Sequence, residues 1–203
     1  MFAGRMGSRK WRVLLAVGLA ELLAMSLWFS ATAAAPELAT RWSLTPAETA
    51  WLTNAVQIGF VVGALGSASL TISDVVTPRY LFAVSAIAGA AATVTIAAVV
   101  DALGPALLLR FLTGVALAGV YPPGMKILAG WFKGARGFAI GVLVGALTVG
   151  SAMPHLIRAI GGVDEPRVVL YGAGALATLG GLLVLVVEPG PYQAPAAPFD
   201  PGA

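Results

Sequence analysis

Six apolar stretches, each long enough to cross a lipid bilayer, follow one another along this chain of 203 residues. A spanning helix needs about 20 mostly apolar residues to cross a hydrocarbon core of about 30 Å. Lipid offers the backbone no hydrogen bonds, and the alternation typical of barrel strands is missing, so helix is the expected structure throughout. The sequence therefore predicts an all-α membrane protein, a bundle of six transmembrane helices over residues 13–34, 48–72, 78–100, 105–131, 137–158 and 168–187.

The composition agrees with three segments: a basic N-terminal segment (1–12), a six-helix transmembrane domain (13–188) and a Pro-rich tail (189–203). Only 10% of the residues are charged, against about 25% in soluble domains, so the lipid bilayer is the expected environment. The prolines of the tail and its lack of periodicity predict disorder. Cysteine is absent and histidine occurs once, so we expect no metal site, and no cofactor motif is present. Basic residues stand at the ends of apolar runs, which argues against nucleic acid as a partner.

The distribution of Lys and Arg predicts the orientation of the chain. If the N-terminus is cytoplasmic, the cytoplasmic side holds more basic residues than the outside, as the positive-inside rule requires. The inner set is Arg5, Arg9, Lys10, Arg12, Arg79, Lys126, Lys133 and Arg136, and the outer set is Arg41, Arg158 and Arg167. We expect an integral protein of a bacterial plasma (inner) membrane, with both termini cytoplasmic. The first stretch could also be a cleavable secretory leader, but its length and the five spans after it favour a span.

Ionisable residues inside the spans are the strongest indication of function, because a charge at membrane depth is costly and usually faces a cavity or a partner. Three- and four-residue spacing places Glu21 and Trp28 on one face of the first span, and Arg110, Thr113 and Tyr121 on one face of the fourth. We predict that these faces line a shared solute pathway, with Glu21 and Arg110 separated by about 10 Å in depth. Two alternatives stay open. Each charge could bind a neighbouring polar group and only orient helices, and Trp28 could pack rather than contact solute.

Further polar and small residues mark the other spans. Asn54 and Gln57 of the second span could face the pathway or bond to a neighbouring helix. Pro122 and Pro123 predict a kink in the fourth span, either static or part of a moving region. Small residues on one side of the second and fifth spans predict close packing or sliding of helices; they are Gly59, Gly63 and Gly66, and Gly141, Gly145, Thr148 and Ala152.

Several of these segments resemble the N-terminal half of a major facilitator superfamily transporter. The resemblance lies in Arg110-Phe-Leu-Thr-Gly114, the Tyr121-Pro-Pro-Gly turn, the basic loop Trp131-Phe-Lys-Gly-Ala-Arg136 and the glycine-rich fifth span. Asp74 and Arg79 match the family's gating loop between the second and third spans. Four other positions of that loop depart from the family pattern, namely Leu70, Val75, Thr77 and Pro78. Gly141 and Gly150 match the antiporter motif, but Pro154 and His155 replace its Gly-Pro, so antiport is not inferred.

The resemblance implies two inverted three-helix repeats, with the solute site between this half and a second six-helix half. It implies that the first and fourth helices line the cavity and that the second and fifth border the other half. The expected function is transport of a small solute by alternating access, with Glu21 as a candidate proton carrier, because a carboxylate in an apolar cavity can take up a proton near neutral pH. The second half would come from a separate chain, a self-dimer or sequence beyond this one.

Two other functions compete with transport. A truncated or structural six-helix membrane protein would associate without transporting anything itself. An intramembrane hydrolase would need a nucleophile such as Ser67 beside His155, but the predicted topology places these residues at opposite membrane faces. We therefore expect no enzymatic activity.

Overall fold

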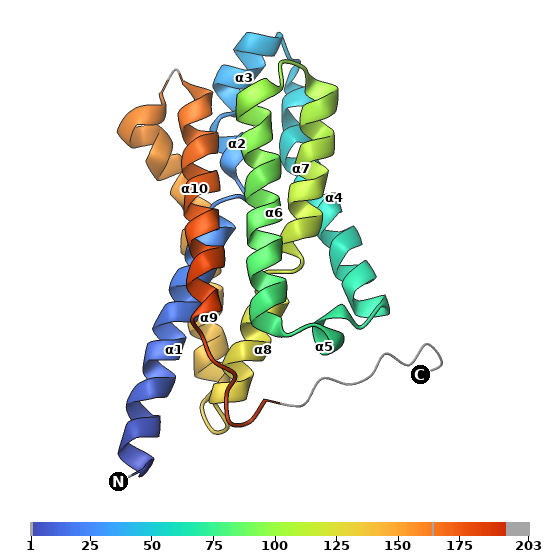
Figure 1. Cartoon of the computed structure of the whole chain (residues 1–203). Coiled ribbons are helices and arrows are strands. Elements are labelled where there is room, and N and C mark those ends of the chain that lie inside the picture. The colour runs from blue at the N-terminus through green and yellow to red at the C-terminus, as the bar shows by residue number, and fades with distance from the viewer. Residues whose placement is uncertain (1, 164, 194–203) are drawn as a thin grey trace.

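The protein is a bundle of helices, and no strand occurs in the part of the chain that the structure describes. The computed structural model describes residues 2–163 and 165–193, with side chains from residue 9 onward. The helices stand side by side along one long axis, with the N-terminus at one end and α3 at the other (Figure 1). In order they are α1 (Phe2–Met25), α2 (Ser30–Ala33), α3 (Ala35–Trp42), α4 (Pro46–Ser69), α5 (Ile72–Val75), α6 (Pro78–Val99), α7 (Leu103–Leu117), α8 (Tyr121–Trp131), α9 (Arg136–Ile157), the π-helical turn η1 (Arg158–Gly162) and α10 (Pro166–Leu185).

Five helical stretches of the described chain are long and apolar enough to cross a membrane. They run over Pro46–Ser69, Pro78–Val99, Leu103–Trp131, Arg136–Gly161 and Pro166–Leu185. These stretches coincide in position with the second to sixth predicted spans, and α1 is a further long helix beside them. The prediction of an all-α membrane protein is therefore confirmed.

The predicted first span, over residues 13–34, is interrupted in the structure. α1 ends at Met25, residues 26–29 form a turn, and only the short α2 follows. The hydroxyls of Ser26 and Ser30 donate to the carbonyl oxygens of Leu23 (2.7 Å) and Leu27 (2.9 Å), three residues earlier. Such bonds compete with the regular helical ladder. The expectation of one continuous helix is thus corrected to a helix, a turn and a second short helix.

The fourth predicted span is also discontinuous. α7 ends at Leu117, a turn covers residues 118–120, and α8 starts at Tyr121. Pro122 and Pro123 lie in the first turn of α8, where proline needs no hydrogen-bond donor and its fixed φ suits the helix. The interruption therefore precedes the prolines, which start a new helical segment.

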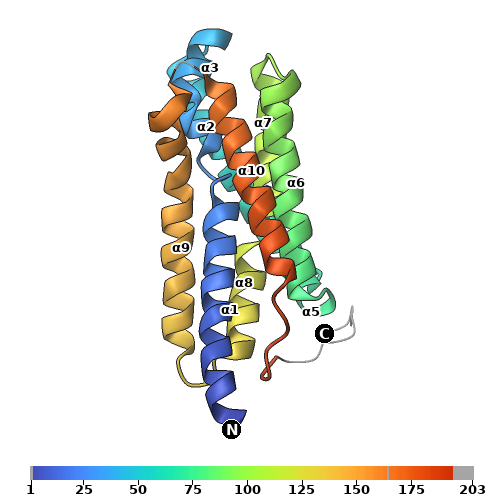
Figure 2. The same ribbon diagram turned by 60° about the vertical axis from the view of Figure 1, so that its left-hand side comes forward.

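Glycines let α4 and α7 approach closely. Side chains added at Gly59 and Gly114 would overlap backbone atoms of Phe111 and Val56, respectively, and one at Gly63 would meet the backbone of Val115. Two of the three glycines predicted to form a seam on the second span, Gly59 and Gly63, thus pack closely against the fourth span, whereas a Cβ atom added at Gly66 would meet no atom within 4 Å. On the other side of the bundle α1 contacts α8, α9 and α10 (Figure 2). α6 contacts both α7 and α10 and lies between them (Figure 1).

Candidate functional site

The two interrupted helices, α1–α2 and α7–α8, carry most of the predicted pathway residues. They are the first and fourth spans, which occupy corresponding positions in the two three-helix repeats that the resemblance implies. Broken helices at corresponding positions of two repeats are the best general indication of a solute site in secondary transporters. The site is therefore built around these two breaks.

Glu21 lies near the end of α1 and is fully buried. Neither of its carboxyl oxygens has a hydrogen-bond partner within the described part of the chain. Its surroundings include Gly124 of α8, since a Cβ atom added there would lie 3.1 Å from Oε2 and 3.5 Å from a methyl group of Leu143. Gly124 thus leaves the room that the carboxyl group occupies. An ionised carboxylate without a partner is costly in such apolar surroundings.

Arg110 of α7 is also fully buried, but its guanidinium group is well satisfied. Nη1 donates to the carbonyl oxygen of Leu27 (3.0 Å) and to Ser30 Oγ (3.2 Å), and Nη2 donates to the carbonyl oxygen of Trp28 (2.5 Å). Nε donates to the carbonyl oxygen of Leu52 on α4 (3.1 Å). Arg110 therefore ties the turn between α1 and α2 to α4 and α7, as the helix-orienting alternative requires.

Glu21 and Arg110 do not form an ion pair in this structure, since the hydrogen-bond partners of Arg110 among the described residues are three backbone carbonyls and a serine hydroxyl. The lack of an ion pair agrees with the difference of about 10 Å in membrane depth that the sequence predicts for Glu21 and Arg110. The open pathway between them is not formed, because both side chains are enclosed within the six-helix unit. Their predicted role in a pathway therefore stays a prediction.

The other predicted pathway residues differ in exposure. Trp28 is partly buried and packs edge-on against Phe60 of α4, with ring centroids 5.0 Å apart. Thr113 is buried, and its hydroxyl donates to the carbonyl oxygen of Leu109 (2.8 Å). Tyr121 is partly buried at the start of α8 and packs against the main apolar core. Trp28 thus has the packing role that the sequence left open, and it is only partly buried.

Asn54 and Gln57 are exposed on α4 and form no hydrogen bond with the described residues. The small residues predicted to line one side of the fifth span are exposed as well, namely Gly141, Gly145, Thr148 and Ala152 of α9. A Cβ atom added at Gly141 or Gly145 would meet no other atom within 4 Å. Gly150, on another side of α9, instead packs against the backbone of Leu22. The described chain therefore leaves polar and small-residue surfaces of α4 and α9 without partners.

The predicted gating residues bind to neighbouring helices. The carboxylate of Asp74 on α5 pairs with Lys126 of α8 at 2.7 Å, and the Lys126 Nζ atom also donates to the carbonyl oxygen of Ser73 (2.5 Å). Arg79 of α6 donates to the carbonyl oxygen of Val187 (3.3 Å) and to the Tyr80 hydroxyl (3.0 Å). The loop is thus attached to α8 and to the end of α10. Lys126, which the sequence places only in the cytoplasmic basic set, is a partner in this attachment.

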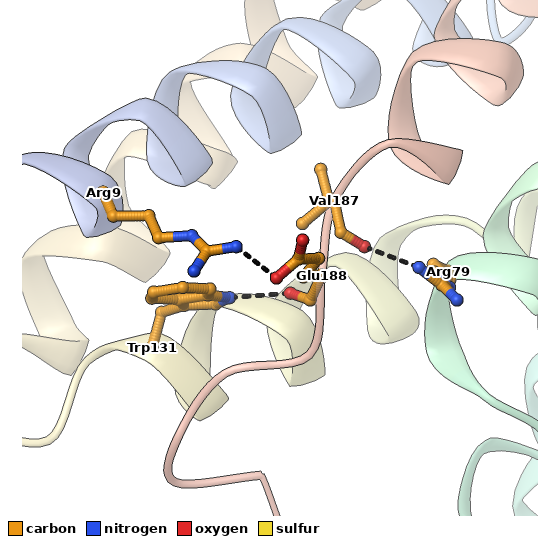
Figure 3. A network of polar contacts seen from close by, with 5 residues as sticks. All are labelled: Arg9, Arg79, Trp131, Val187 and Glu188. Atoms are coloured by element: carbon orange, nitrogen blue, oxygen red, sulfur yellow. Dashed lines mark hydrogen bonds and ion pairs between the residues drawn. The ribbon is translucent and has the colours of Figure 1, made fainter. Parts of the chain in front are cut away.

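Residues 186–193, here called the strap, cross the same end of the bundle after α10 (Figure 3). Arg9 of α1 forms an ion pair with Glu188, and Trp131 Nε1 donates to the Glu188 carbonyl oxygen (3.0 Å). The Tyr192 amide donates to the carbonyl oxygen of Gly130 (2.9 Å). The strap and the gating loop enclose a cavity of about 120 Å³, lined by Asp74, Arg79, Lys126, Glu188 and Gln193 among others.

The contacts of the strap differ from the disorder predicted for residues 189–203. Residues 189–193 are held against α8, and residues 194–203 lie outside the described residues. Sequence reasoning missed Arg9, Trp131 and Glu188, because their contacts join positions up to 179 residues apart. The charge of Glu188 directly after an apolar span was the one available signal.

Comparisons with known proteins agree with the fold. A family model described as Major Facilitator Superfamily matches residues 5–201. The structure is similar to that of a bacterial homolog to the human lysosomal transporter Spinster, crystallised in an inward-facing and unoccupied conformation, with a TM-score of 0.74 and 20% sequence identity. The similarity covers 95% of this chain and 46% of that chain, so this chain spans less than half of the transporter's length. No curated protein matches the chain. The chain therefore belongs to the major facilitator superfamily, and it has the fold of the N-terminal six-helix half.

Proposed function

We propose that the chain transports a small solute as one half of a secondary transporter that works by alternating access. Membership of a family of membrane carriers supports transport in general. The observation that carries the assignment to one half is the match to 46% of a complete transporter. The surfaces of α4 and α9 that have no partner among the described residues agree with it. In this family fold the solute site lies between two halves, so a second six-helix half is required. It would be supplied by a separate chain, a second copy or further sequence.

We infer that Glu21 binds and releases the coupling proton. Its carboxyl group is buried, has no hydrogen-bond partner among the described residues, and lies beside the interrupted fourth span at Gly124. Movement between inward- and outward-facing states would change the access of water to this position. A group that is costly to ionise when enclosed, and easier to ionise when hydrated, couples protonation to that movement.

Arg110 has a supporting role in this proposal. Three of its four hydrogen bonds hold the turn between α1 and α2 and the start of α2, and the fourth goes to Leu52 of α4, so the position of Glu21 relative to α8 depends on it. Solute contacts are assigned to side chains that reach the unit's surface, namely Trp28, Asn54, Gln57 and Tyr121. Asp74 and Arg79 are assigned to a gate at the end of the bundle that also holds the strap. The surplus of basic residues there favours the cytoplasmic face of a bacterial plasma membrane.

Transport is tested by uptake into proteoliposomes that contain the chain alone or together with candidate second halves, using a panel of radiolabelled small solutes. We expect uptake above that of empty liposomes in at least one combination that includes a second half. Uptake at background in every combination would instead support a six-helix membrane protein without transport activity of its own.

The proton site is tested separately by infrared difference spectroscopy of the purified chain across a pH series. We expect an absorption band of a protonated carboxyl group that disappears at high pH and is missing in the Glu21→Gln variant. A Glu48→Gln variant is the control, since Glu48 caps the exposed start of α4. An unchanged band in the Glu21→Gln variant would exclude Glu21 as the titrating group.

A further inference from the structure

Four basic residues lie near Phe132, in space or along the chain, at the end of the bundle where α1 begins. The Nζ atom of Lys10 lies 5.7 Å from the centroid of the Phe132 ring. Lys133 follows Phe132 in the chain, and Arg136 Nε donates to the Phe132 carbonyl oxygen (2.8 Å). Arg12 follows Trp11 in the chain, and the Trp11 ring packs edge-on against Phe132 with centroids 5.6 Å apart. Lys10, Arg12, Lys133 and Arg136 are called the basic cluster below.

The basic cluster has no carboxylate partner in the described part of the chain. The ion pairs formed there join Arg9 to Glu188, Lys126 to Asp74 and Arg158 to Glu37. Arg12, Lys133 and Arg136 are exposed, and Lys10 is partly exposed. Four positive charges on a short stretch of surface repel one another, and an anion placed among them removes that repulsion.

An apolar stripe leads away from the basic cluster along α1. Trp11, Leu15 and Leu19 follow one another at four-residue spacing and are 45%, 71% and 49% exposed. Phe138 of α9 is 58% exposed and packs against Trp11, with ring centroids 5.9 Å apart. Exposed aromatic rings between a charged end and an apolar helix surface are typical of the level of lipid headgroups. The apolar stripe therefore faces acyl chains where the basic cluster meets the headgroups.

We propose that the basic cluster and the stripe of Trp11, Leu15 and Leu19 form a binding surface for an anionic phospholipid. The phosphodiester group lies among the basic side chains, and an acyl chain lies along the stripe. Charge complementarity selects an anionic headgroup, and the stripe selects a lipid over a free phosphate ion. The inference requires membrane insertion alone, so it is independent of the proposed transport.

The test measures lipid binding by the purified full chain in detergent. Native mass spectrometry records the retention of phosphatidylglycerol and of phosphatidylcholine, and thermal unfolding records the stabilisation by each. The Lys10→Gln/Arg12→Gln double variant is compared with Arg41→Gln/Arg167→Gln, which removes two exposed charges from the opposite end of the bundle. We expect wild type and the control to prefer phosphatidylglycerol, and the Lys10/Arg12 variant to bind it roughly 30-fold more weakly, at about fivefold per charge.

A second variant covers the case in which changes in α1 impair folding. Lys133→Gln changes one exposed loop residue and should weaken phosphatidylglycerol binding about fivefold. Equal binding of both lipids by the wild type, or equal loss in the control variant, would overturn the proposal. The same holds if inorganic phosphate alone gives the full stabilisation, or if a second six-helix half displaces the bound lipid.

Discussion

Arg110 and Glu21 are both fully buried charges near helix breaks, yet their surroundings are opposite. Arg110 has four acceptors, whereas Glu21 has no hydrogen-bond partner among the described residues. The sequence predicted that both residues matter and that they do not touch, because their depths follow from position along the spans. It could not predict the partners of Arg110, because three of them, Leu27, Trp28 and Ser30, lie at an interruption of the first span that the sequence did not reveal.

This contrast predicts different effects on stability. Replacing Arg110 by Gln removes the four hydrogen bonds of the guanidinium group, to the carbonyl oxygens of Leu27, Trp28 and Leu52 and to Ser30 Oγ. We expect the free energy of unfolding to fall by about 2–4 kcal/mol, since each lost hydrogen bond contributes about 1 kcal/mol and membrane hydrogen bonds average somewhat less. In Glu21→Gln the side chain keeps its shape, and no hydrogen bond to a described residue is lost. We therefore expect the free energy of unfolding to change by no more than about 1 kcal/mol.

Both variants are measured by reversible unfolding of the purified chain in mixed micelles. A larger loss for Glu21→Gln than for Arg110→Gln would contradict the assignment of Arg110 to structure and of Glu21 to function.

Among the helices, regular starts such as the cap of α4 could be predicted from the local sequence, whereas the interruption after α1 could not. Thr45-Pro46-Ala47-Glu48 has the sequence pattern of a capping box, and the box is present: Thr45 Oγ1 accepts from the Glu48 amide at 3.3 Å and the Thr45 amide donates to Glu48 Oε2 at 2.8 Å. Thr77-Pro78 has the same start, but Thr77 forms no side-chain cap. The break after α1 depends on two serine hydroxyls and on Arg110, about 80 residues away, so local periodicity could not reveal it.

The α4–α7 seam gives a prediction with an internal control. Gly114→Ala places a methyl group against the Val56 carbonyl oxygen, which cannot move without displacing α4. We expect a loss of about 1–3 kcal/mol of unfolding free energy from this overpacking. Gly145→Ala adds the same group where no atom lies within 4 Å, and should be neutral or slightly stabilising in the isolated chain because Ala favours helix. Equal losses of unfolding free energy in Gly114→Ala and Gly145→Ala would contradict close packing of α4 against α7 at Gly114.

The strap gives a prediction about local opening. Trp131→Phe removes the donor to the Glu188 carbonyl oxygen while keeping an aromatic ring in place. Loss of one hydrogen bond, worth about 1 kcal/mol, should speed hydrogen exchange of the Tyr192 amide about fivefold. Trp51→Phe, at an exposed site on α4, is the control and should leave that exchange rate unchanged. An unaltered rate in Trp131→Phe would mean that Trp131 does not hold the strap.

For the whole molecule, the unpartnered side of α9 is the feature that a half transporter requires. Family membership was predicted from a few motif residues, and the matched family model extends that recognition over residues 5–201. The composition and the spans were sufficient for the fold class, because the bilayer allows few alternatives. The solute could not be predicted, because specificity depends on side chains from both halves at a site between them.

Pairing with a second half is tested by a matched pair of substitutions. Ala152 on α9 and Ala175 on α10 are both exposed, and only Ala152 lies on the small-residue side of α9. We expect Ala152→Leu to prevent copurification with a tagged second half, because the larger side chain blocks close approach of helices. Ala175→Leu should leave copurification intact, and both variants should unfold like the wild type. Equal copurification in both would place the interface elsewhere.

The most direct test of the account is solute uptake into proteoliposomes holding this chain and its second half, measured with and without an inward proton gradient. The account predicts that the gradient accelerates uptake by the wild type, and that uptake by the Glu21→Gln variant no longer responds to the gradient. Gradient-driven uptake that persists unchanged in Glu21→Gln would contradict it.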